Sequence, residues 1–488
     1  NFKIYSFEKL INCSLFKNLR LGIDPKLFTN IQIKNYFLKY NKIKHIEKNL
    51  IDEIKKQKEN TSIPFFSLKK KIVGESVNSK LNKISKYLKK NRCDYIFISA
   101  PENVAWTLNI RGGDGPNSPV PNSRLIISKS KKIFLITNFK KCKKLFKNKV
   151  IKKDEFLNED DLPKKILNLK GKYFIVDNKS CSIFYENLIK SKFKIINRED
   201  PTYLLKAIKN KTEIKNMTNA HISDGVALTK FLFWIKKINK KKITEVEAAK
   251  KLENFRKLNK NFLYPSFDTI AGSGKNGAIV HYRAKKENCR TINKKDILLC
   301  DSGGQYKYGT TDVTRTICFS KQKQKIKNIF TKVLKGHIAV ATTNINKEDN
   351  GKKIDKRARK FLNKSNLDYA HGTGHGVGFF LNVHEGPQSI TKINTVKIRE
   401  GMILSNEPGY YKTNEYGIRI ENLVYVKKIN KKLLFQNLTM APLEKDLINF
   451  NLLTVNEKDY LFKYHLEVYS KISKYLSPNE KKWLASFI

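Results

Sequence analysis

The chain has 488 residues, of which 40% are hydrophobic and 29% charged, and this excludes a fibrous or wholly disordered protein. Its formal net charge is +54 at pH 7, and no apolar run approaches the roughly 20 residues of a membrane-spanning helix. The N-terminus lacks a signal-peptide pattern, so no membrane partner is predicted.

The positive charge comes mainly from Lys, which is spread over the whole chain; only 13 of the 98 basic residues are Arg. Arg is the side chain that reads phosphates and bases bidentately, and the sequence has no focused basic patch. The composition therefore favours a lysine-rich surface with no specific nucleic-acid partner. A basic nucleic-acid-binding protein is the alternative, and salt-dependent binding without sequence preference would count against it.

The cysteines are odd in number, widely spaced and without a CxxC pair, which argues against a disulfide framework or a structural zinc site. A reduced, cytoplasmic location is predicted on this basis. Position 1 is not Met, and we expect a processed or incomplete N-terminus. The seven cysteines are Cys13, Cys93, Cys142, Cys181, Cys289, Cys300 and Cys318.

In chain order, the first predicted elements form an α/β unit. The first seventy residues are rich in Lys and Asn, with short apolar runs such as 10–16, and residues 64–71 have the composition of a linker. Helical periodicity follows over 80–90. Runs rich in β-forming residues follow at 95–99, 125–128, 133–137 and 173–176. This alternation predicts an α/β domain that ends near residues 200–201.

An α+β region is predicted next. A long helix is expected over 212–237, and Thr244 with Glu247 forms a capping box that opens a second helix, to about residue 258. The last forty residues have helical patterns, and a final helix is expected to begin at Ser477-Pro478. Between these helices, strands punctuated by glycines are predicted at 267–271, 297–300, 313–319, 402–404 and 418–426.

Two aspartates lie where adjacent strands are predicted to meet. Asp301 ends an apolar strand, and Asp312 begins the return strand after a Gly-rich turn, so the two carboxylates are expected side by side. Neighbouring buried carboxylates repel, and each resists ionisation. Either aspartate alone could instead be a turn or helix-capping residue.

The segment HGTGHGVGFFLNVHEGP carries His371, His375 and His384 within fourteen residues. The first two have metal-ligand spacing for a helix, but the intervening glycines favour a loop or a close-packed strand. Glycines at 372, 374, 376 and 378 are expected to let a ligand or metal approach the backbone. A single histidine is ordinarily structural, but three so close together favour a functional role.

Two glutamates complete the candidate set. Glu407 precedes a Pro-Gly turn, and Glu421 lies in the apolar run IRIENLVYV, where the period of a strand puts Arg419 on the same face and allows it to neutralise Glu421. Four buried carboxylates cannot all ionise without compensation, and two divalent ions would balance them. One imidazole and no thiolate favour an ion such as Mn²⁺. Two such ions can hold and activate a water, so a hydrolase is predicted.

The ordered segments IVHY, DSGGQYKYGTTDVTRT, HGTGHGVGFFLNVHEGP, EPGYY and GIRIEN closely resemble the aminopeptidase P (Xaa-Pro aminopeptidase) family of the pita-bread metallopeptidase superfamily. Residues 103–114 resemble its middle domain, and 456–484 resemble the C-terminal extension of its long, cytosolic-type enzymes. The implied fold class is α/β and α+β, with creatinase-N-like α/β domains before a pita-bread (creatinase-like) catalytic domain.

The resemblance implies four parts. We expect a partial N-terminal domain over 1–72, a second creatinase-like domain over 73–204, the catalytic domain over 205–445 and a helical extension over 446–488. Only about seventy residues precede the middle domain, so the N-terminal domain is expected to be cut off, which would affect substrate access and dimer contacts.

The implied activity is that of a metalloaminopeptidase, which hydrolyses the N-terminal Xaa-Pro bond of peptides through a water activated by two metal ions, usually manganese. Relatives are often homodimers, and a homodimer is expected. Asp312 and Glu421 would each contact both ions, and Glu407 would also handle the proton of the water. The implied metal ligands are Asp301, Asp312, His375, Glu407 and Glu421.

Other side chains would line the site by the same resemblance. His281, His371 and His384 would contact the substrate and stabilise the tetrahedral intermediate. Arg419 would orient Glu421 and the neighbouring carboxylates, and Tyr411 is a weaker candidate for the pocket.

Two other functions stay open. A prolidase-type dipeptidase would split Xaa-Pro dipeptides, although the two-part N-terminal region and the C-terminal tail favour the aminopeptidase. A non-catalytic pita-bread binding protein would have lost ligands, whereas this chain retains all five. Asn406 stands where relatives vary, and little consequence is expected from it.

Overall fold

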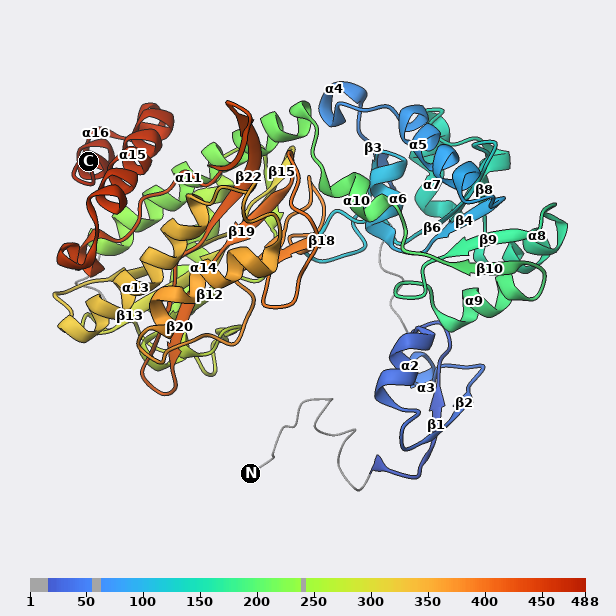
Figure 1. Cartoon of the computed structure of the whole chain (residues 1–488), viewed down its shortest axis with the longest axis horizontal. Coiled ribbons are helices and arrows are strands. Elements are labelled where there is room, and N and C mark those ends of the chain that lie inside the picture. Colours follow the sequence, from blue (N-terminus) through green and yellow to red (C-terminus); the bar gives the residue numbers. More distant parts are fainter. Residues whose placement is uncertain (1–15, 55–62, 238–242) are drawn as a thin grey trace. The chain divides into compact units, whose positions relative to one another are not determined.

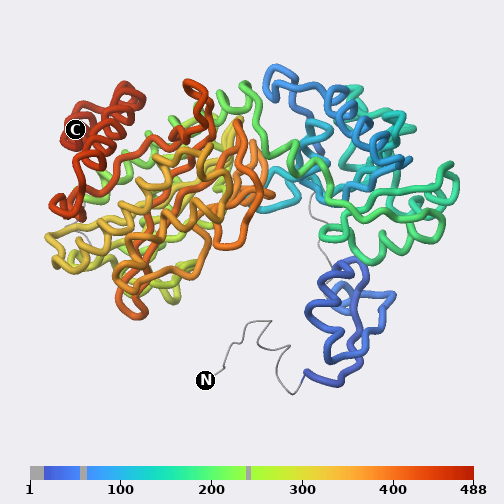
Figure 2. Tube along the Cα trace, in the orientation of Figure 1, coloured from blue at the N-terminus to red at the C-terminus, as the bar shows by residue number. Residues whose placement is uncertain are grey.

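The computed structural model describes residues 16–54, 63–237 and 243–488, and it divides into two compact units, Asn1–Tyr203 and Leu204–Ile488 (Figure 1, Figure 2). Cys13 and nearly all of the predicted apolar run 10–16 lie outside the described residues. Within those three ranges, no helix is both long enough and apolar enough to cross a membrane.

The first unit is built on a mixed six-stranded sheet with the order β10-β9-β4-β6-β7-β8. Both faces of the sheet are buried, which explains runs that are apolar at every position, such as IFLI in β7. The four strands predicted for this unit are confirmed. The strands are β4 (Tyr95–Ile98), β6 (Arg124–Ser128), β7 (Ile133–Ile136), β8 (Phe156–Leu157), β9 (Tyr173–Val176) and β10 (Lys194–Asn197).

Helices cover both faces of this sheet. Ile96 and Ile98 pack towards α5 (Val77–Lys90) and α7 (Phe139–Lys147), and Phe97 between them packs towards α8 (Leu162–Asn168) and α9 (Ile183–Lys190). The remaining elements are β1 (Arg20–Ile23), α2 (Asn30–Tyr36), β2 (Lys42–His45), α3 (Leu50–Ile54), β3 (Phe66–Ser67), α4 (Lys70–Val73), α6 (Pro101–Thr107) and β5 (Ile110–Arg111). Helix α10 (Thr202–Ala207) spans the boundary between the units.

Helices and several short sheets make up most of the described part of the second unit. The predicted capping box at Thr244 and Glu247 is present, and each predicted helix start lies within one residue of the observed one. The helices are α11 (Lys211–Lys237), α12 (Glu245–Lys257), α13 (Gln324–Ala341), α14 (Gly351–Asn363), α15 (Val455–Ile472) and α16 (Pro478–Ala485). Of these, α11 packs beside α12, and α13 packs beside α14.

Two of these sheets carry most of the candidate residues. The strand orders are β12-β13-β16 and β18-β17-β19-β22-β23, and a two-stranded sheet pairs β20 with β21. Strands β11 (Phe262–Pro265), β14 (Gly304–Tyr306) and β15 (Gly309–Thr310) form a third small sheet. The strands are β12 (Ile270–Ser273), β13 (Ile297–Ser302), β16 (Val313–Cys318), β17 (Gly374–Gly376), β18 (Glu385–Ile390), β19 (Ile403–Asn406), β20 (Gly409–Lys412), β21 (Tyr416–Arg419), β22 (Asn422–Ile429) and β23 (Lys432–Asn437).

Two strand predictions were wrong. The strand expected over 267–271 begins only at Ile270, because β11 ends at Pro265 and the chain turns before β12. The strand expected over 418–426 is two strands: β21 pairs with β20, and β22 pairs with β19. Residues 420–421 form the transition between these sheets, so Glu421 lies at a break and not inside a continuous strand.

Candidate active site

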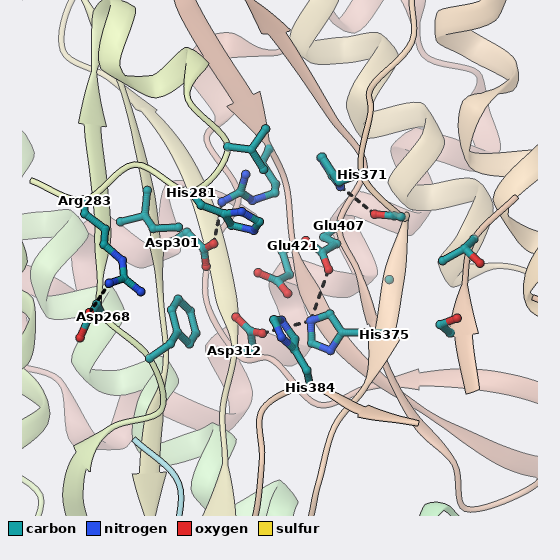
Figure 3. Close-up of a pocket in the computed structure, with 18 residues that line it drawn as sticks. Asp268, His281, Arg283, Asp301, Asp312, His371, His375, His384, Glu407 and Glu421 are labelled. Atoms are coloured by element: carbon teal, nitrogen blue, oxygen red, sulfur yellow. Dashed lines mark hydrogen bonds and ion pairs between the residues drawn. The ribbon is translucent and has the colours of Figure 1, made fainter. Parts of the chain in front are cut away.

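The five predicted metal ligands line one cavity of about 460 Å³ in the second unit (Figure 3). Short antiparallel strands bring them together from distant parts of the sequence; β13 and β16, for example, pair Asp301 with Thr314. Asp301 lies in β13, Asp312 just before β16, His375 in β17, Glu407 between β19 and β20, and Glu421 between β21 and β22.

His375 lies at the centre of the group. Its Nε2 is 3.4 Å from Asp312 Oδ2 and 3.4 Å from Glu407 Oε1. Ligand atoms of Asp312, His375 and Glu421 all lie within 4.8 Å of one another. Figure 3 shows the imidazole between the carboxylates of Asp312 and Glu407, with Glu421 beside them.

The second nitrogen of His375 fixes its tautomer. Nδ1 lies 2.9 Å from the carbonyl oxygen of Gly376, so it carries the proton and donates it to that oxygen. In the neutral ring, Nε2 is then left with a lone pair facing two carboxylates. This is the orientation of a metal-ligating histidine whose other nitrogen is held by a backbone carbonyl.

Asp301, Asp312 and Glu421 are buried, and Glu407 is half-buried beside them. Burial, followed by repulsion from neighbouring carboxylates, holds the pKa of Asp312 and that of Glu421 well above their usual ranges. Burial also raises the pKa of Glu407. Asp301 Oδ1 and Glu421 Oε1 are buried and find no hydrogen-bond donor among the described residues. These oxygens, with the Nε2 lone pair, form a donor set that fits divalent cations.

Arg419 pairs with Asp301, whereas the sequence pattern had suggested a pair with Glu421. Its Nη2 donates to Asp301 Oδ2 at 2.6 Å, and its Nε donates to Thr314 Oγ1 at 3.1 Å. The reason is the break at residues 420–421, which ends the two-residue alternation that put both side chains on one face.

Tyr411 connects Arg419 to His371. Arg419 Nη1 donates to the Tyr411 hydroxyl at 2.6 Å, and that hydroxyl lies 2.8 Å from His371 Nε2. His371 Nδ1 faces the carbonyl oxygen of Gly372 at 2.7 Å, so Nε2 accepts the proton of Tyr411. Burial and the nearby Arg419 lower the pKa of His371 to about 4, so the ring is neutral near pH 7.

The other two predicted histidines also line the cavity. His281 is exposed to solvent at the cavity wall, near Asp301 in Figure 3. The ring of His384 meets that of His375 edge to face, with their centroids 4.2 Å apart. All the site residues predicted from the sequence therefore lie in or beside this cavity.

The glycines around His375 let neighbouring strands approach closely, and Gly372 and Gly374 also line the cavity. A Cβ added at Gly374 would lie 2.0 Å from the carbonyl oxygen of Ser405, and one at Gly376 would lie 2.3 Å from that of Glu385. The close approach is therefore made by the backbones of β19 and β18. These contacts hold β17 between its neighbours, as the close-packed strand interpretation predicted.

Several supporting side chains were missed. Ser405 Oγ donates to Glu407 Oε1 and accepts from the backbone N of His375, both at 2.9 Å. Thr314 Oγ1 donates to Glu421 Oε2, also at 2.9 Å. Each lies two residues from a predicted ligand in its own segment, so strand alternation could have identified it. At the mouth, Asp268 and Arg283 form an exposed ion pair of 3.7 Å.

Three family models match successive parts of the chain. The Creatinase/Prolidase N-terminal domain matches residues 30–213, Metallopeptidase family M24 matches 215–428, and the C-terminal region of peptidase_M24 matches 431–486. The second match contains all five predicted ligands.

Similar proteins align with nearly the full length of this chain. Xaa-Pro aminopeptidase 1 of Dictyostelium discoideum is 36% identical, over 94% of this chain and 77% of that protein. Aminopeptidase P2 of Arabidopsis thaliana is also 36% identical, over 95% of this chain and 72% of that protein.

Solved structures are similar as well. A cytosolic X-prolyl aminopeptidase of Caenorhabditis elegans with a di-nuclear active site superposes with a TM-score of 0.89 at 29% identity, covering 99% of this chain and 82% of that one. The prolidase of Pyrococcus furiosus has a TM-score of 0.59 at 25% identity, covering 73% of this chain and 98% of that one.

The raised carboxyl pKa values predict an unusual pH dependence for the metal-free chain. A carboxyl whose pKa is higher in the folded state contributes stability below its unfolded pKa, about 4, and loses it as the pH rises through the folded value. We expect the melting temperature of chelator-treated protein to fall as the pH is raised above about 4, and a divalent ion to reverse the fall.

The Asp312→Asn variant provides the control for this measurement. It removes one of the repelling carboxylates, so its melting temperature should fall less over the same pH range. An equal fall in the variant and the unmodified chain would show that other groups cause the pH dependence.

Proposed function

Because the chain belongs to the Xaa-Pro aminopeptidases of metallopeptidase family M24, we propose that it removes the N-terminal residue from peptides whose second residue is proline. The expected fold class, a creatinase-like N-terminal domain before a pita-bread catalytic domain, is confirmed by the same matches. The observation that carries the proposal is the convergence of four carboxylates, three of them buried, and one imidazole in a single cavity.

The five converging residues are proposed as ligands of two divalent ions. Two unpaired buried oxygens, on Asp301 and Glu421, and the Nε2 lone pair of His375 support this assignment. Ions held there would lower the pKa of a water and polarise the scissile carbonyl. Oxygen ligands with one imidazole favour manganese over a metal that prefers thiolates. The proposed ligands are Asp301, Asp312, His375, Glu407 and Glu421.

Glu407 is proposed to accept and return a proton during hydrolysis. Its raised pKa brings it closer to neutral pH than an ordinary carboxyl, which suits a general base. Its Oε1 is fixed by Ser405 Oγ at 2.9 Å, so the carboxylate is held in one orientation. The exposed fraction of its side chain is 16%, which leaves the group accessible from the cavity.

The histidines are proposed to bind the substrate and the tetrahedral intermediate. Burial and the nearby Arg419 lower the pKa of His371, so the ring is neutral, and the Tyr411 hydroxyl orients it. His281 and His384 line the cavity. An Xaa-Pro bond is a tertiary amide without an N–H, so the site has to recognise it without a donor at that nitrogen.

We also propose a reduced, cytoplasmic location and a homodimer. The cysteines of the described residues are unpaired, in keeping with a reduced cytoplasmic compartment. The family resemblance suggests a homodimer, and light scattering should then give twice the mass of one chain. A mass equal to that of a single chain would contradict the dimer.

A prolidase-type dipeptidase is the second candidate, since the prolidase of Pyrococcus furiosus has a similar structure. The aminopeptidase is favoured because the similarity to the Caenorhabditis elegans enzyme covers 99% of this chain, whereas that to the prolidase covers 73%. A non-catalytic role is disfavoured because the ligand set is complete.

The activity is tested by release of the N-terminal residue from an Xaa-Pro-Yaa tripeptide, with Mn²⁺ added and after chelation. We expect manganese-dependent cleavage of this peptide, but none of Xaa-Ala-Yaa and little of an Xaa-Pro dipeptide. Asp312→Asn should reduce kcat/KM by more than about 100-fold. This exceeds the loss of about 10- to 100-fold that is usual for a residue that only hydrogen-bonds to a metal ligand. Preferential cleavage of the dipeptide would support the prolidase instead.

Tyr411→Phe tests the link between Arg419 and His371. Loss of the hydroxyl removes two hydrogen bonds, so kcat/KM should fall by about 10-fold. Tyr410→Phe is the matched control, because Tyr410 packs against Tyr416 and the apolar core. Equal kinetics in the two variants would argue against a role for the Tyr411 hydroxyl.

A further inference from the structure

Arg315 is a buried guanidinium close to the proposed metal site. It lies in β16, three residues after Asp312, and is 2% exposed. Among the described residues, no carboxylate forms an ion pair with it. A buried charge without a counter-charge is costly unless all of its donors are satisfied, so its hydrogen bonds indicate what it stabilises.

The donors of Arg315 bind three separate segments of backbone. Nη1 donates to the carbonyl oxygens of Glu421, at 2.6 Å, and Thr314, at 2.9 Å. Nε donates to Pro442 O and Nη2 to Ala441 O, both at 2.8 Å. One planar group therefore connects β16, the break that carries Glu421, and the segment that follows β23.

Arg315 also binds a side chain of the C-terminal extension. Arg315 Nη2 donates to the hydroxyl of Tyr464, in α15, at 3.1 Å, and that hydroxyl donates to Ala441 O at 2.6 Å. Tyr464 is 3% exposed. Figure 1 shows α15 beside α11 in the second unit. The helix is thus joined to the backbone of Glu421 through a single guanidinium.

Glu421 depends on such support. Like Asp312 and Glu407, it lies outside any strand, so no ladder of hydrogen bonds fixes it, although its backbone N donates to Thr314 O at 3.2 Å. Its carboxylate is held by Thr314 Oγ1 on one oxygen, while the other has no donor in the described part of the chain. The Arg315 Nη1 contact at 2.6 Å fixes its carbonyl oxygen.

We propose that Arg315 and Tyr464 are positioning residues for the metal site, through which α15 of the C-terminal extension fixes Glu421 for metal binding. This inference rests on the proposed function, because it takes Glu421 to be a ligand. A ligand held in position in advance binds its ion without the cost of ordering its own segment. Loosening the support should therefore weaken metal binding before it unfolds the protein.

The test compares two tyrosines of the same helix. Tyr464→Phe removes the hydroxyl that binds Arg315 and Ala441. Tyr460→Phe is the matched control: it lies one turn earlier, its ring stacks with Tyr464 at 6.4 Å, and its hydroxyl accepts only a 3.2 Å bond from Asn437 Nδ2. Both variants lose one buried hydroxyl from α15, but only Tyr464→Phe loses a contact with the guanidinium.

The readouts are Mn²⁺ binding to the chelator-treated full chain, by calorimetry, and the melting temperature of the metal-free protein. We expect Tyr464→Phe to weaken Mn²⁺ binding by about 3- to 10-fold, the range for one buried hydrogen bond. Tyr460→Phe should bind Mn²⁺ within about 2-fold of the unmodified chain, and both metal-free variants should melt at similar temperatures. Arg315→Lys, with fewer donors, should weaken binding further.

Two results would overturn the inference. One is Mn²⁺ affinity in Tyr464→Phe equal to that of the unmodified chain; the other is an equal loss of affinity in both tyrosine variants. Either result, in a chain that binds Mn²⁺ and cleaves Xaa-Pro-Yaa, would leave the proposed function intact. An unmodified chain that neither binds Mn²⁺ nor cleaves the peptide would overturn the proposed function itself.

Discussion

Repulsion between buried carboxylates is the constraint on which the catalytic unit depends. The four proposed ligand carboxylates share one cavity, and Arg419 is the only cation that forms an ion pair with any of these four among the described residues. Burial, together with this repulsion, raises the pKa values of Asp312 and Glu421. The surrounding strands, Ser405 and Thr314 hold these groups together against their repulsion, an arrangement that suits the divalent cations proposed to bind there.

The sequence was sufficient to predict the composition of the site but not its internal connections. Asp301, Asp312 and His375 could be identified because residue type, glycine content and strand period are local properties. The pairing of Arg419 with Asp301 was not predicted, because it depends on a break at residues 420–421 where the chain passes from one sheet to another. Arg315 was missed for a related reason: its partners lie more than a hundred residues away.

For the helices, strands and domains of the chain, too, local patterns were predictable and long-range arrangement was not. Apolar runs and caps were enough to place four strands of the six-stranded sheet in the first unit and the starts of α11, α12 and α16. The structure separates two compact units at residues 203 and 204, while the finer divisions expected at 72 and 446 stay predictions. Asn406, which was expected to have little consequence, is fully buried and donates to the carbonyl oxygen of His337 at 2.9 Å.

The packing of β17 has a consequence for how this enzyme could change during evolution. Gly374 and Gly376 leave no room for a side chain on either side of His375, because backbone oxygens of neighbouring strands occupy that space. New substrate preferences cannot arise by substitution at these positions without separating the strands. Variation is instead available at the rim, where Asp268 and Arg283 are exposed and paired only loosely. Substitutions at the entrance can therefore alter the approach to the cavity without disturbing the packing of β17.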